Sequence, residues 1–160
     1  MSIFPINLPV LVKRTLDPRD PNPCRGCSDC CEYVAVPLAR PRARKDYDEL
    51  FWFLLHRNVW IFIDEDDDWF IQFNTPCLQL RDQRCGIYDR RPVLCRDYAV
   101  ADCTTYAPGS GQKTLFTRPD EFAAWVQKHR PKTYARLQSY YGGAWPVPRG
   151  DLPRAWASAG

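Results

Sequence analysis

The stretch that decides the organisation of this chain is Cys24-Arg25-Gly26-Cys27-Ser28-Asp29-Cys30-Cys31. Two residues separate Cys24 from Cys27 and Cys27 from Cys30, and this spacing lets a tight turn bring two sulfur atoms onto one ion. Gly26 supplies the backbone freedom that such a turn needs. On a helical turn these three cysteines share a face, whereas Cys31 points roughly 100° away from Cys30. The stretch predicts a thiolate metal site, and the divergent Cys31 favours a second metal position.

Four further cysteines follow at gaps of seven, nine and seven residues: Cys77, Cys85, Cys95 and Cys103. These gaps form no motif by themselves, but each cysteine stands near a Pro, Gly or Arg and is expected on a loop or short turn. The total of eight thiols suits two four-coordinate zinc ions, and it equally suits one four-iron four-sulfur cluster with four thiols remaining. We therefore predict that all eight cysteines are ligands of zinc or iron.

The chain shows no export signal, because its first 14 residues lack a basic n-region and a small-residue cleavage site. The longest apolar stretches, 51–55 and 59–63, are too short to cross a bilayer. We expect a cytoplasmic protein without a membrane segment. In that reducing compartment, clustered cysteines are more often metal sites than disulfides.

Composition fits a single domain of 160 residues, with 45% apolar residues to build a core and 15 prolines that favour short, loop-connected segments. The net charge of +3 is mild and is largely offset once thiolates hold metal, so nucleic-acid binding is not expected. Arg40, Arg42, Arg44 and Lys45 form the densest basic run. We expect this run to face the thiolate sites or an acidic protein partner.

Apolar spacing predicts an amphipathic helix over 45–57. A second helix is expected from Thr117, with Asp120 three residues on as a near capping box. Pro131 is expected to break this helix and Gly142–Gly143 to end it. Apolar alternation and β-branched or aromatic runs predict strands at 8–12 and 34–38 and a hairpin of 59–63 and 69–73. A helical turn is expected at 92–98 and an irregular tail over 144–160. The expected fold is α+β, with a small irregular antiparallel sheet and two or three helices organised around a cysteine metal centre. Residues 1–112 would form the metal-binding domain with its N-terminal lead-in, and 113–160 a helical segment and tail packed on it.

Other chemistry finds little support. Asp64, Asp66 and Asp68 alternate like the opening of a calcium loop, but Trp69 replaces the required Gly, so a solvated hairpin turn is the better interpretation. His56 and His129 both fall near predicted helix C-termini, where they favour the helix dipole. We expect capping roles for both histidines and find no catalytic motif independent of the metal centre.

The ordered motifs resemble a known family. The first cluster, Pro76-Cys77, Cys85-Gly86-Ile87-Tyr88 and Arg91-Pro92-x-x-Cys95-Arg96 look like the YkgJ-type cysteine-cluster family over roughly residues 20–106, a family described as a zinc- or iron-chelating domain. Among these residues, Arg91 and Arg96 are expected to donate hydrogen bonds towards thiolate sulfur. Tyr88 is expected to fill the core.

Three functions stay open. Zinc would hold loops together as a structural ion. Flagellin lysine methylases contain a similar cysteine cluster associated with an iron–sulfur centre, and this resemblance implies redox or methyl-transfer chemistry. Metal storage or delivery is the third alternative.

Overall fold

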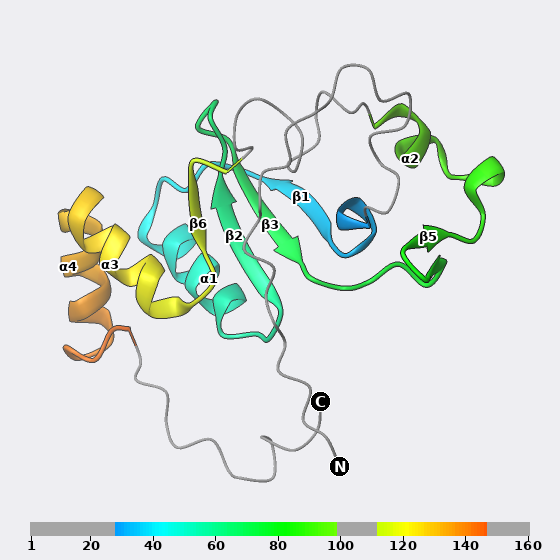
Figure 1. Cartoon of the computed structure of the whole chain (residues 1–160). Coiled ribbons are helices and arrows are strands. Elements are labelled where there is room, and N and C mark those ends of the chain that lie inside the picture. The colour runs from blue at the N-terminus through cyan, green and yellow to red at the C-terminus, as the bar shows by residue number, and fades with distance from the viewer. Residues whose placement is uncertain (1–27, 99–111, 147–160) are drawn as a thin grey trace, which may run out of the picture. The chain divides into compact units, whose positions relative to one another are not determined.

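The computed structural model describes residues 28–98 and 112–146 (Figure 1). Cys24, Cys27, Cys103 and the strand expected at 8–12 lie outside the described residues, as does most of the expected tail. In chain order the elements are η1 (Asp29–Cys31), β1 (Val34–Leu38), α1 (Arg44–Leu54), β2 (Val59–Ile63), β3 (Trp69–Phe73), β4 (Leu80–Arg81), β5 (Arg84–Cys85), η2 (Tyr88–Arg90), α2 (Val93–Asp97), β6 (Thr114–Phe116), α3 (Pro119–His129) and α4 (Pro131–Tyr140).

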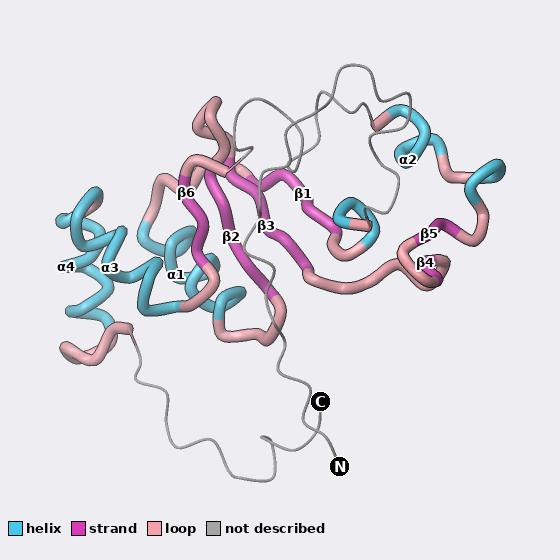
Figure 2. Tube along the Cα trace, in the orientation of Figure 1, coloured by secondary structure: helices cyan, strands magenta, loops and turns pink. Residues whose placement is uncertain are grey.

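The fold class is α+β, as the sequence predicts. Within the described residues, four strands form one sheet in the order β1-β3-β2-β6, and β4 pairs with β5 in a separate two-stranded sheet (Figure 2). β1 and β3 are antiparallel, with Val34 opposite Phe73 and Leu38 opposite Trp69. The predicted strands 34–38, 59–63 and 69–73 are confirmed at both ends. The short strands β4, β5 and β6 were not predicted.

The chain divides into two compact units. Unit 1 comprises residues 1–38 and 62–115, and unit 2 comprises 39–61 and 116–160. The described cysteines all fall in unit 1, whereas α1, α3 and α4 belong to unit 2.

Unit 2 has an aromatic and aliphatic core. Phe122 of α3 is fully buried, and its ring lies 6.4 Å from that of Tyr47 on α1 and 5.3 Å from that of Phe116. Trp145 is only 1% exposed and its ring lies 5.2 Å from that of Phe51, so this residue of the expected irregular tail belongs to the core. Among the described residues of the unit, the other buried hydrophobic side chains are Leu50, Leu54, Val59, Ile61, Ala123, Val126 and Leu137.

Helix α1 begins one residue earlier and ends three residues earlier than predicted. At its start, the Asp46 carboxylate accepts hydrogen bonds from the backbone N–H groups of Arg42 and Ala43, both at 2.8 Å, which satisfies donors that the helix leaves unpaired. At its end, the N–H groups of Leu55 and His56 bond carbonyls three residues back, and these tighter bonds close the helix before position 57.

The second predicted helix begins at Pro119 rather than at Thr117. Proline suits the first helical position because its missing N–H would have no helical partner there. The expected box partner was Asp120, but Glu121 accepts from the backbone N–H and hydroxyl of Thr117, at 2.9 and 3.0 Å, while Asp120 pairs with Arg118. The break at Pro131 and the helix end at Gly142–Gly143, whose φ values are 61° and 86°, are confirmed.

Unit 1 is buried only along its strands. Phe62, Ile63, Trp69, Ile71 and Gln72 are its buried residues among those described. The acidic turn between β2 and β3 is a solvated hairpin turn as predicted, in which Asp64 accepts from the N–H groups of Asp66 and Asp68 at 3.0 and 2.9 Å. No residue from 73 to 98 and none from 28 to 38 is buried.

Candidate metal centre

The end of the first cysteine cluster forms the short 3₁₀ helix η1. The N–H of Cys31 bonds the carbonyl of Ser28 at 2.7 Å, and the Ser28 hydroxyl donates to Glu32 at 2.9 Å. Cys30 is exposed and Cys31 is partly buried. The second metal position that Cys31 favours remains a prediction.

A backbone hydrogen bond joins the two cysteine groups directly. The N–H of Cys77 donates to the carbonyl of Cys31 at 2.7 Å, although 45 residues separate them in the sequence. Next, the N–H of Leu80 bonds the carbonyl of Cys77 at 2.9 Å in a turn, and the Cys77 sulfur accepts from the N–H of Gln79 at 3.5 Å. This arrangement brings Cys77 to the end of the first cluster.

Cys85 is presented by a hairpin that the sequence did not reveal. β4 and β5 pair Leu80 with Cys85, and the two residues between the strands, Asp82 and Gln83, have φ values of 48° and 60°. Two consecutive positive φ values are typical of the tight hairpin turn that asparagine–glycine pairs usually mark. After the hairpin, the N–H of Gly86 bonds the carbonyl of Gln79 at 2.8 Å.

Cys95 lies on the single-turn helix α2, which follows Pro92 as expected. The guanidinium of Arg91 lies 3.6 Å from the ring centroid of Tyr88, and its Nε donates to the Tyr88 carbonyl at 2.8 Å. The expectation that Tyr88 fills the core is wrong, because the residue is 57% exposed and supports Arg91 instead. Arg96 is exposed at the end of α2.

The thiols lie near enough to influence one another electrostatically. Partial burial raises the pKa of the Cys31 thiol most, the hydrogen bond with Cys30 lowers it, and Cys77, Cys85 and Cys95 each raise it as neighbouring sites of negative charge. A group of thiolates repels itself, and a bound cation reverses that effect. The donor set of soft sulfur atoms fits zinc or iron.

The described part of the chain does not by itself contain a closed ligand shell. Among residues 28–98 and 112–146, no three Cys, His, Asp or Glu side chains lie close enough to surround one ion. Of the eight predicted ligands, the structure describes Cys30, Cys31, Cys77, Cys85 and Cys95, all as free thiols. It brings these five into one region of unit 1. The predicted ligand roles of all eight remain predictions.

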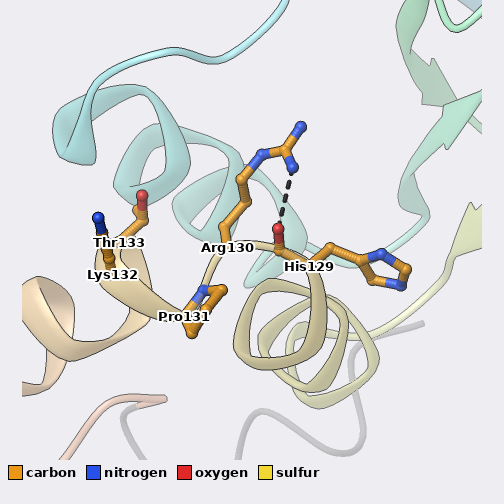
Figure 3. Close-up of a pocket in the computed structure, with 5 residues that line it drawn as sticks. All are labelled: His129, Arg130, Pro131, Lys132 and Thr133. Atoms are coloured by element: carbon orange, nitrogen blue, oxygen red, sulfur yellow. Dashed lines mark hydrogen bonds between the residues drawn. The ribbon is translucent and has the colours of Figure 1, made fainter.

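The two histidines occupy the helix ends that the sequence indicated. The Nδ1 atom of His56 lies 3.0 Å from the carbonyl oxygen of Trp52 in the last turn of α1. His129 is the last residue of α3, and its ring stacks on Trp125 at 4.8 Å. A hollow of about 300 Å³ lies at the α3–α4 junction. Figure 3 shows the residues that line it, including Arg130, which donates to the His129 carbonyl at 2.9 Å. These contacts give both histidines a structural role.

A search with family models finds one that covers residues 23–124, more than half of the chain. It is CxxCxxCC, described as a putative zinc- or iron-chelating domain, and the match supports metal binding. Curated proteins yield no match, and neither do solved structures. In the described ranges, every helix is too short or too polar to traverse a lipid bilayer.

Proposed function

Because the chain belongs to the CxxCxxCC family, we propose that it binds zinc or iron through Cys24, Cys27, Cys30, Cys31, Cys77, Cys85, Cys95 and Cys103, and that this centre holds the cysteine-bearing loops of unit 1 in place. The role needs reduced thiols, and a cytoplasmic location would supply them.

One observation carries this proposal. The segment 73–98 contains three of the cysteines, yet none of its residues is buried. Leu78 is 92% exposed and Leu94 is 81% exposed, so the segment lacks the apolar burial that normally offsets the entropy of ordering a chain. Metal binding adds folding free energy to loops of this kind, since a preformed site rarely exists in the unfolded state.

The charged residues beside the cysteines are suited to support thiolates. Arg96 is exposed one residue after Cys95 and is proposed to donate towards thiolate sulfur. Arg91 keeps its two terminal nitrogen atoms for the same purpose, because its contacts with Tyr88 use the Nε atom and the ring face. Both arginines lower the cost of concentrating negative charge at the centre.

The test is metal analysis of protein purified anaerobically from its native source, with a visible spectrum. We expect stoichiometric zinc or iron that falls in Cys31→Ser and in Cys77→Ser. Ser28→Ala is the matched control, because it alters the same 3₁₀ turn without removing a thiol. Unchanged metal content in both cysteine variants would refute the ligand assignment.

Metal delivery is a second candidate function, favoured by one observation. Cys30, Cys77 and Cys95 are exposed, and exposed ligands can pass an ion to a partner more easily than a closed structural site can. Rapid metal release to a mild chelator, with an unchanged circular dichroism spectrum, would support delivery over a structural role.

The iron–sulfur alternative is decided by the same preparation. A brown protein with iron and acid-labile sulfide would support a cluster with redox or methyl-transfer chemistry. A colourless protein loaded with zinc would support the structural function.

A further inference from the structure

Unit 2 contains a shallow hollow of about 430 Å³ whose lining includes no cysteine. Arg44, the first residue of α1, forms one wall, and Arg136, Ser139 and Tyr140 of α4 form the other. This volume falls within the range of about 300–1,000 Å³ that small-molecule sites occupy. Arg44 also belongs to the basic run that the cysteine chemistry left without a role.

The two arginines of the hollow carry uncompensated charge. Within residues 28–98 and 112–146, neither Arg44 nor Arg136 forms an ion pair with a carboxylate. The nearest acidic groups along α1 are already engaged. Asp46 accepts from two backbone N–H groups, and Asp48 accepts from the Tyr141 hydroxyl at 2.7 Å.

We propose that this hollow binds a phosphate group, as the free dianion or as a monoester on a small molecule. Each guanidinium presents five N–H donors in a planar fork that matches phosphate oxygens, and two such groups balance a charge of about −2. A carboxylate carries a single negative charge and would need only one of the two guanidinium groups. The Ser139 hydroxyl adds a donor at the same wall.

The hollow is held in shape before any ligand arrives. The Arg44 guanidinium lies 4.1 Å from the ring centroid of Tyr140, which fixes the arginine across the gap between the helices. Leu137 is fully buried, and the bond between Tyr141 and Asp48 ties the end of α4 to α1. A site whose groups are already positioned loses little conformational entropy on binding.

The test is calorimetric titration of the full-length protein with inorganic phosphate and with phenyl phosphate at low ionic strength. We expect saturable binding at one site, with Arg136→Gln and Arg44→Gln each weakening it about tenfold or more, because each substitution removes charge-assisted hydrogen bonds to the phosphate oxygens. Arg42→Gln is the control, since it removes the same charge from the same run but does not line the hollow.

Arg44→Lys keeps the positive charge and should still weaken binding, because a lysine lacks the planar fork. Binding of phenyl phosphate should also weaken as the pH falls below about 6, where the dianion of the monoester takes up a proton. Tighter binding of phenyl phosphate than of phosphate would identify a phosphorylated molecule as the ligand class, and equal affinity would identify the free ion. Absence of saturable binding to either probe, or an equal loss in Arg42→Gln, would overturn the proposal.

Discussion

The sharpest prediction concerns metal removal and the segment 74–98. A strong chelator, applied with a reductant so that no disulfide forms, should unfold this segment locally while the helices of unit 2 stay folded. The assay is amide hydrogen exchange followed by mass spectrometry of peptides covering 77–95 and, for comparison, α3.

The expected magnitude follows from the burial. Ordering each residue costs about 1–2 kcal/mol, and each net hydrogen bond returns only about 1 kcal/mol. The hairpin that carries Cys85 pairs only two residues of each strand, and nothing from 74 to 98 is buried. Without metal, the local opening free energy is therefore close to zero, and the amides should exchange within about tenfold of an unfolded peptide.

With metal bound, the segment opens only when a ligand dissociates. Structural zinc sites contribute about 10 kcal/mol or more, and even about 4 kcal/mol of this in local stability protects amides about a thousandfold. Amides of Phe122 and Val126, both fully buried in α3, serve as the internal control and should not change. Equal exchange of the 77–95 peptides with and without metal would refute the reasoning.

Three further predictions concern unit 2. Tyr141→Phe should cost about 1 kcal/mol of unfolding free energy at neutral pH, since the bond to Asp48 is charge-assisted but partly exposed to water. That bond raises the pKa of Tyr141 from 10.0 to about 12. The stabilisation is therefore complete below pH 10.0 and is lost as the pH rises towards about 12. Urea unfolding measured over this pH range should show the free energies of unfolding of the variant and the wild type converge. Leu137→Ala should cost about 3 kcal/mol in the same assay without reducing metal content. Asp46→Asn should lower the melting temperature at neutral pH but not in strong acid. The reason is that the backbone N–H groups of Ala43 and Arg42 lower the pKa of Asp46, and this stabilisation disappears as the pH falls through the lowered pKa. An equal drop in melting temperature at both pH values would contradict this.

The regular elements were predictable wherever one physical signal was strong. Strands 34–38, 59–63 and 69–73 follow from β-branched and aromatic runs, and α1 follows from apolar residues at spacings of three and four. β4 and β5 escaped prediction because each has two residues, and because Asp82 and Gln83 adopt positive φ without the glycine that usually marks such a turn. Trp145 looked like part of a tail because its burial depends on Phe51, which is distant in sequence.

The sequence by itself predicted sulfur as the donor atom and zinc or iron as the metal, because cysteine spacing and thiol softness are properties of the residues alone. Only the tertiary structure decided that Cys77 meets Cys31 through a backbone hydrogen bond, that Tyr88 supports Arg91 at the surface, and that Arg44 and Arg136 face one hollow. The physical reason is that spacing constrains neighbours within a turn or two. Contacts between distant residues depend on how the intervening helices and strands pack.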